Sequence, residues 1–171
     1  MERIASFEKV SYERFREDWI NNYPDTEETE ILRIYEGIQM PRRATRGSAG
    51  YDFFAPADLV IPPGEELLVP TGIRVKIATG YVLMLFPRSS LGFKYRLQLN
   101  NTVGIIDSDY YLADNEGHIF CKLTNDTTRN KTVEINTGAG MVQGIFVSFG
   151  ITVDDNVSAD RSGGFGSTDT R

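Results

Sequence analysis

Residues 73–86 read IRVKIATGYVLMLF and contain two strand patterns separated by a turn signal. Residues 73–77 alternate apolar and charged side chains, which is typical of a strand with one buried face. Residues 81–86 form an apolar run that predicts a strand buried on both faces. Short strand patterns of this kind, broken by glycine and proline, recur at the spacing of sandwiches and barrels, so we expect an all-β fold. Further strands are expected over residues 132–136 and 145–153.

The N-terminal segment, residues 1–30, follows a different pattern. Tyr12, Phe15 and Trp19 recur at helical spacing after Ser11, a residue type that often caps the N-terminus of a helix. The Asn-Asn-Tyr-Pro run that follows predicts the end of this helix. We expect a helix that packs on the outside of a β domain, where the strand period begins at about residue 31. Nothing in its residues supports a role in binding a partner.

Composition excludes several classes of protein. The chain has 171 residues, a formal net charge of -6, one cysteine and one histidine. Because Cys121 and His118 stand alone, an internal disulfide framework and a cysteine- or histidine-rich metal site are excluded, and a cytoplasmic location is expected. The acidic balance argues against a broad nucleic-acid-binding surface, although a few arginines suffice for a small anionic ligand. The longest near-apolar stretch, residues 81–87, is too short to span a membrane.

The last stretch, residues 158–171, is rich in glycine, serine and threonine and contains one large apolar residue, Phe165. Such a segment buries too little surface to offset the entropy of ordering it, so we expect it to be flexible. Its residues leave two interpretations open. It is either a frayed terminus or an arm whose glycine amides surround phosphates while Phe165 covers an aromatic ligand. The predicted units are the helical extension over 1–30, the β domain over 31–157 and the arm over 158–171.

Two stretches place polar residues where a sandwich does not need them. RGSAGYDF at 46–53 brings Asp52 into a predicted strand, where a carboxylate is disfavoured unless another group holds it. PRSSLG at 87–92 places an arginine and two hydroxyl groups at the end of a strand, a set that suits an oxyanion such as phosphate. A satisfied aspartate in a turn and an ordinary polar turn are the alternatives.

Two more stretches follow further along the chain. NNTVGIIDSDYY at 100–111 places Asp107 at the end of an apolar strand, where partial desolvation could tune it as a base. GAGMVQG at 138–144 places Gln143 among small and apolar neighbours. A turn and an outward-facing strand position are the simpler interpretations of these residues.

In their order and separation, these four stretches and GGFGST at 163–168 resemble the five successive motifs of the trimeric dUTP diphosphatases, or dUTPases. The resemblance covers roughly residues 31–171. It implies a β jelly roll in which three chains share three active sites and the arm of one chain closes over a site formed by the other two. It also implies hydrolysis of dUTP to dUMP and pyrophosphate by Mg²⁺-assisted attack of water on the α-phosphorus, which limits uracil incorporation into DNA and supplies dUMP.

The resemblance also implies a role for individual residues. Asp107 corresponds to the general base, and Asp52 corresponds to a residue that acts near the metal through water. Tyr110 corresponds to the tyrosine that packs on the sugar and leaves no room for a 2′-hydroxyl, Asn101 lies in the hairpin that reads uracil, and Phe165 corresponds to the ring that stacks on the base. The other implied substrate-binding residues are Arg88, Ser89, Ser90, Gly104, Gln143, Arg161, Gly166 and Ser167.

The chain departs from the family pattern after Tyr110, where residues 111–117 form a longer, acidic loop. Two other functions remain as alternatives. A dCTP deaminase of the same superfamily would need a glutamate beside the base, but Lys122 occupies the comparable position. A non-catalytic nucleotide-binding module would not need Asp107, which is present.

Overall fold

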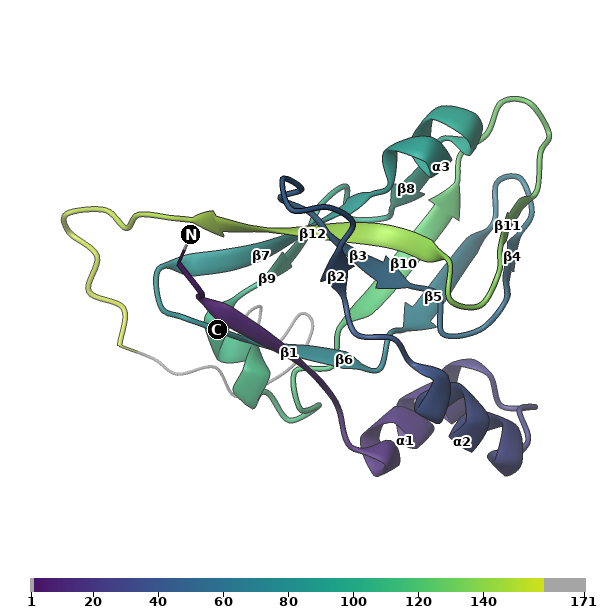
Figure 1. The fold of residues 1–171 in the computed structure, drawn as a ribbon, viewed down its shortest axis with the longest axis horizontal. Helices are drawn as coiled ribbons and strands as arrows, with labels where there is room; N and C mark the ends of the chain where they lie inside the picture. The colour runs from purple at the N-terminus through teal and green to yellow at the C-terminus, as the bar shows by residue number, and fades with distance from the viewer. Residues whose placement is uncertain (1, 159–171) are drawn as a thin grey trace.

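The structure is a computed structural model that describes residues 2–158. Its antiparallel strands form a sandwich around one hydrophobic core, and two helices lie against one end of it (Figure 1). The predicted all-β class is therefore confirmed. In chain order the elements are β1 (Ala5–Lys9), α1 (Tyr12–Asn22), α2 (Glu28–Gly37), β2 (Arg42–Arg43), β3 (Tyr51–Phe54), β4 (Leu59–Ile61), β5 (Glu66–Pro70), β6 (Ile73–Ile77), β7 (Tyr81–Pro87), α3 (Ser89–Tyr95), β8 (Leu97–Leu99), β9 (Gly104–Ile106), the 3-10 helix η1 (Ser108–Leu112), β10 (Phe120–Asn125), β11 (Val133–Ile135) and β12 (Gly140–Ser148).

The largest sheet has the strand order β2-β3-β12-β7-β9, and a second sheet has the order β5-β10-β8. β6 and β7 are consecutive in the chain but pair with different strands, so the chain changes sheets at the turn around Gly80. Gly80 has a φ of 87°, which a glycine adopts without strain. β6 alternates as predicted. In β7, Leu83 and Leu85 are buried on one face, and on the other Val82 is buried while Met84 and Phe86 are partly buried, so the strand is more fully buried than β6, as predicted.

The N-terminal segment is part of the core. β1 pairs with β6, and α1 begins where predicted, with the backbone N–H of Arg14 donating to Ser11 Oγ (3.1 Å). Val10, Phe15 and Trp19 are all buried in the main hydrophobic cluster. α1 packs against the end of the β sandwich as expected, but its buried side chains belong to the main core, and the strand β1 was not predicted.

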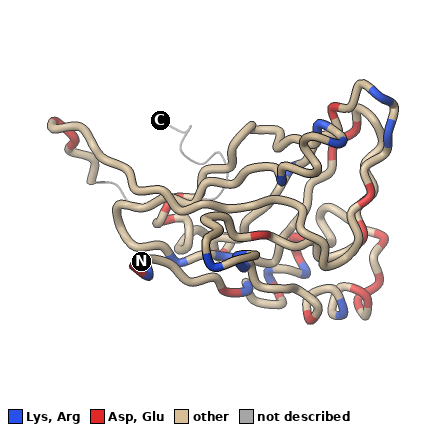
Figure 2. Tube along the Cα trace, turned by 45° about the horizontal axis from the view of Figure 1, so that its top comes forward, with Lys and Arg blue, Asp and Glu red and all other residues tan. Residues whose placement is uncertain are grey.

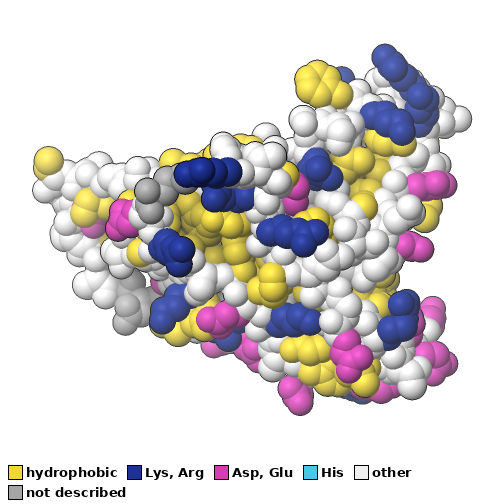
Figure 3. Space-filling model, viewed as in Figure 1, with side chains coloured by type: hydrophobic (Ala, Val, Ile, Leu, Met, Phe, Trp, Pro, Cys, Tyr) yellow, Lys and Arg dark blue, Asp and Glu magenta, His cyan; other side chains and the backbone are white. Residues whose placement is uncertain are grey.

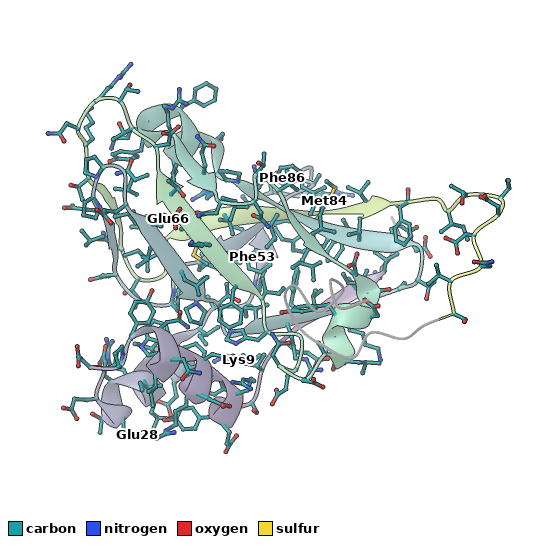
Figure 4. All side chains as sticks on the ribbon, turned by 180° about the vertical axis from the view of Figure 1, so that it is seen from behind. Lys9, Glu28, Phe53, Glu66, Met84 and Phe86 are labelled. Atoms are coloured by element: carbon teal, nitrogen blue, oxygen red, sulfur yellow. The ribbon has the colours of Figure 1, made fainter. Side chains whose placement is uncertain are left out.

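Polar contacts tie this segment together as well. Figure 4 shows Lys9 where β1 meets the helices and Glu28 on the outer side of the helix pair. Lys9 Nζ donates to the carbonyl oxygen of Tyr35 at 2.7 Å, near the end of α2. Glu28 accepts hydrogen bonds from Tyr12 and Arg16 of α1, each at 2.6 Å. The two helices are thus joined to each other and to β1.

Three local expectations need correction. The strand period does not begin at residue 31, because α2 buries Ile31 and Ile34 at helical spacing and continues to Gly37. The ordinary polar turn given as the alternative for residues 87–92 is not formed, because Ser89–Tyr95 is the helix α3. The strand expected over 145–153 ends at Ser148, and beyond it Ile151 is 75% exposed. No helix among residues 2–158 is long and apolar enough to cross a bilayer.

Candidate active site

Strand pairing brings three of the predicted site residues together. In the pairing of β3 with β12, Gln143 lies opposite Asp52. In the pairing of β12 with β7, Gln143 lies opposite Phe86, two residues before Arg88. Stretches far apart in the sequence therefore meet at one end of the largest sheet.

The side chains in this region are held closely. Arg88 Nε lies 3.2 Å from Asp52 Oδ1, and Arg88 Nη1 donates to the carbonyl oxygen of Gly140 at 3.3 Å. A Cβ at Gly140 would lie 2.5 Å from Arg88 Nη1, and one at Gly50 would lie 2.8 Å from Gln143 Oε1. The glycines of these two stretches are therefore required for the close approach of Arg88 and Gln143 to the backbone.

A cleft of about 590 Å³ opens beside Arg88, and we call it the arginine cleft. Ser89, the first residue of α3, lines it, and Ser90 is exposed on the same helix. Figure 3 shows basic side chains on the face that presents β2, β3 and β12, with apolar and uncharged surface between them. An arginine, a glutamine amide and a hydroxyl group on one cleft suit a phosphate. The cleft is lined by Phe86, Pro87, Arg88, Ser89, Gly92, Phe93, Leu97, Gln143 and Ile145.

A second cavity of about 420 Å³ lies beside Asn101, and we call it the Asn101 pocket. Asn101 and Gly104 both line it, and Asn101 lies between β8 and β9, which belong to different sheets rather than to the predicted hairpin. A Cβ at Gly104 would lie 3.1 Å from Leu85 Cβ, so only glycine fits between β9 and β7 without a shift. The pocket walls are largely apolar, which suits a nucleoside better than a triphosphate. Its lining is Leu68, Leu85, Leu99, Asn100, Asn101, Gly104, Ile106, Phe120 and Lys122.

Sequence reasoning missed Phe120 as a pocket residue and considered Lys122 only for the deaminase alternative. Both belong to β10, where alternate residues share a face. The strand pattern of 120–125 could therefore have predicted that Phe120 and Lys122 lie on the same face. Lys122 Nζ lies 2.5 Å from Glu66 Oε2, and Asn100 Nδ2 donates to Glu66 Oε1 at 2.6 Å. The hydrogen bonds from Lys122 and Asn100 lower the pKa of the Glu66 carboxyl.

Asp107 and Tyr110 take the positions that the third stretch predicts in the chain. Asp107 directly follows β9 and precedes η1, so an apolar strand does deliver a carboxylate at its end. Tyr110, in η1, is only 4% exposed. Its hydroxyl donates to the carbonyl oxygen of His118 at 2.8 Å and accepts from Asn115 Nδ2 at 2.8 Å. Tyr110 is therefore buried, and its orientation depends on His118 and Asn115 in the segment that leads to β10.

The arginine cleft and the Asn101 pocket lie on opposite faces of β7. Leu85 lines the Asn101 pocket and Phe86 lines the arginine cleft, and successive side chains of a strand point to opposite faces. In Figure 4, Met84 and Phe86 lie on one side of this sheet and Phe53 lies on the other. The structure thus places Arg88, Ser89 and Gln143 on one face of β7 and Asn101 and Gly104 on the other, while Asp107 and Tyr110 line neither cavity.

Charge is distributed over the whole described surface rather than gathered on one face, as the interspersed blue and red segments of Figure 2 show. Within residues 2–158, His, Cys, Asp and Glu side chains form no group of three that could hold a metal ion. The predicted arm residues Arg161, Phe165, Gly166 and Ser167 lie outside the described residues.

Comparison with known proteins identifies the family of the chain. The dUTPase family model matches residues 36–169. The deoxyuridine 5′-triphosphate nucleotidohydrolase of Lactococcus lactis is 44% identical over 144 residues, which cover 81% of this chain and 95% of the relative. The corresponding protein of Tolumonas auensis is 39% identical, over 80% of this chain and 91% of the relative.

Solved structures support the same assignment. The crystal structure of dUTPase from Streptococcus mutans superposes with a TM-score of 0.64 at 36% identity, covering 88% of this chain and 99% of that one. The dUTPase of Staphylococcus bacteriophage 80alpha with dUpNHpp shares the fold, with a TM-score of 0.64 at 20% identity over 94% of this chain and 92% of that one. The family model covers most of the chain, and the Lactococcus relative matches almost from end to end. The chain belongs to the dUTPase family.

Proposed function

We propose that the chain hydrolyses dUTP to dUMP and pyrophosphate, in the cytoplasm. The observation that carries this proposal is the division of the site. A phosphate-binding set on the arginine cleft and a nucleoside-sized Asn101 pocket are each built from the stretches that resemble the dUTPase motifs. The relatives from Lactococcus lactis and Tolumonas auensis, both named for this reaction, support it.

The chain's own residues account for each requirement of the reaction. Arg88, Gln143 and Ser89 bind the phosphates, and Asp52 holds the Arg88 guanidinium in orientation through their contact at 3.2 Å. Asp107 accepts a proton from a water molecule while the oxygen of that water bonds to the α-phosphorus. The bond from this phosphorus to the bridging oxygen of the β-phosphate then breaks, and pyrophosphate leaves. A positioned general base of this kind contributes about 10²- to 10⁴-fold in rate.

Magnesium fits this site only as a companion of the substrate. Mg²⁺ is usually bound through one or two carboxylates together with substrate phosphates and water, which agrees with the lack of a three-residue metal group among residues 2–158. Asp52 is the carboxylate on the phosphate side that would hold it, through water. Bound to the triphosphate, Mg²⁺ would offset negative charge at the reacting phosphorus.

We further propose that three copies of the chain form the complete sites. The arginine cleft and the Asn101 pocket lie on opposite faces of β7. One dUTP molecule can therefore contact an arginine cleft and an Asn101 pocket at once only if the two belong to different chains. The segment after β12 also exposes several apolar side chains, which association would bury: Phe149 (52% exposed), Ile151 (75%), Val153 (108%) and Val157 (74%). The arm residues Arg161, Phe165, Gly166 and Ser167 would close each site.

The test is product analysis of the purified protein with dUTP and Mg²⁺. We expect release of pyrophosphate and dUMP, and the Asp107→Asn variant should bind nucleotide but turn over at least about 10²-fold more slowly. Ammonia release from dCTP would favour the deaminase alternative. Nucleotide binding without product would favour a non-catalytic module.

A further inference from the structure

Three polar links connect the N-terminal segment to the loop that follows the Asp107 stretch. The hydroxyl of Tyr111 donates to Glu8 Oε2 at 2.7 Å. Ser11 donates to Glu116 through both its backbone N–H (2.8 Å) and its hydroxyl (2.6 Å). His118 Nδ1 lies 2.6 Å from Asp18 Oδ2. The loop over 111–117 is therefore attached to Glu8 of β1 and to Ser11, the residue that caps α1, and His118, directly after the loop, is attached to Asp18 of α1.

The link between Asp18 and His118 is the most buried of the three. His118 is 0% exposed and Asp18 is 8% exposed. The backbone N–H of Gly72 donates to His118 Nε2 at 2.8 Å, so Nε2 carries no proton and Nδ1–H is the donor to Asp18. Asp18 is in turn held by Arg14, from Nε at 3.0 Å and from Nη2 at 2.7 Å. Asp18 thus fixes both the tautomer and the orientation of His118.

His118 contacts Phe120, which lines the Asn101 pocket, and Tyr110, which is buried beside it and does not line the pocket. Its carbonyl oxygen accepts the hydroxyl of Tyr110, and its ring centroid lies 4.5 Å from that of Phe120. Phe120 lines the Asn101 pocket. Tyr110 is the residue to which we assign rejection of a 2′-hydroxyl. A movement of the His118 ring would therefore change the pocket wall at Phe120, and a movement of its backbone carbonyl would change the position of Tyr110.

We propose that Asp18 of α1 is a positioning residue for nucleotide selectivity, acting through His118 on Tyr110 and Phe120. The proposal rests on the proposed function, because it concerns discrimination between dUTP and UTP at that site. Asp18 lies outside the stretch of 36–169 that the family model matches, so the role is a property of this chain's N-terminal segment. The arrangement makes α1 a support for the pocket as well as a part of the core.

The experiment compares kcat/KM for dUTP with kcat/KM for UTP in the wild type, Asp18→Ala and Asp18→Asn. Asp18→Ala leaves the buried Nδ1–H of His118 without its acceptor, and we expect the dUTP-to-UTP ratio to fall about tenfold. Asp18→Asn retains a side-chain oxygen that can accept the hydrogen bond from His118 Nδ1–H. The dUTP-to-UTP ratio of this variant should therefore be close to that of the wild type. Partial unfolding lowers the activity on both substrates equally and leaves the ratio unchanged. Glu13→Ala, on the exposed side of α1, is the matched control and should keep the wild-type ratio.

An unchanged ratio in Asp18→Ala, or an equal fall in Asp18→Asn, would overturn the proposal. If Asp18→Ala does not fold, the wild type provides the second test, because His118 is the one histidine of the chain and its side-chain ¹⁵N signals need no assignment. We expect these signals to shift when a non-hydrolysable dUTP analogue binds, and their failure to shift would contradict the link to the pocket. A wild type that does not hydrolyse dUTP would refute the proposed function instead.

Discussion

Replacing Phe15 by alanine tests whether the N-terminal segment belongs to the core. Phe15 is 0% exposed, and its ring centroid lies 5.3 Å from that of Trp19, 5.6 Å from that of Tyr35 and 6.2 Å from that of His118. Truncation of a fully buried phenylalanine costs about 3–5 kcal/mol in the free energy of unfolding, because it removes apolar burial and leaves a cavity among these rings. For a chain of this size, the loss corresponds to a fall in Tm of roughly 6–20 °C.

Urea unfolding provides the assay, followed by far-UV circular dichroism and by the fluorescence of Trp19, the one tryptophan of the chain. All samples need the same chain concentration, because association of chains would raise the apparent stability. Leu32→Ala on α2, where the side chain is 42% exposed, is the matched control and should change stability by about 0.5 kcal/mol or less. A Phe15→Ala variant as stable as this control would refute the assignment of α1 to the core.

Two further predictions concern the arginine cleft and the buried histidine. Gly140→Ala should raise KM for dUTP about tenfold with little effect on stability, because the new Cβ would lie 2.5 Å from Arg88 Nη1. Gly37→Ala is the control, because a Cβ there meets nothing within 4 Å. Equal KM values for the two variants would contradict the role of Arg88. Burial lowers the pKa of His118 below its usual value, against the opposing effect of Asp18. As the pH falls through about 6.5, the unfolded chain therefore takes up a proton that the folded chain does not, and the free energy of unfolding should decrease. A His118→Gln variant should lack this part of the decrease between about pH 7 and pH 5, and an identical pH profile for both proteins would contradict a neutral, buried His118.

The local patterns predicted many single elements. The Ser11 cap with α1, the alternation in β6 and the carboxylate of Asp107 at the end of β9 all follow from residues close together in sequence. They depend on side-chain spacing and capping, which the sequence displays directly. The family resemblance was carried by the order of short stretches, and it is confirmed.

Long-range pairing was not accessible in the same way. Nothing in residues 5–9 identifies β6 as the partner of β1, and pairing context decides whether such a segment forms a strand. The segment 28–37 was missed as a helix, although Ile31 and Ile34 lie at helical spacing and Glu28 and Glu30 occupy its first turn, where acidic residues favour a helix. Phe120 was missed because its exposure to the Asn101 pocket depends on β5 and β8 flanking β10. The contact of Asp18 with His118, 100 residues apart, is likewise a product of the tertiary fold.

Hydrolysis of dUTP in ¹⁸O-labelled water, in the presence of Mg²⁺, tests the central claim most directly. If Asp107 activates water for attack on the α-phosphorus, the label should appear in the phosphate of dUMP and pyrophosphate should remain unlabelled. The Asp107→Asn variant should give almost no labelled product over the same time. Label in pyrophosphate, or wild-type rates of labelling in the Asp107→Asn variant, would contradict the account.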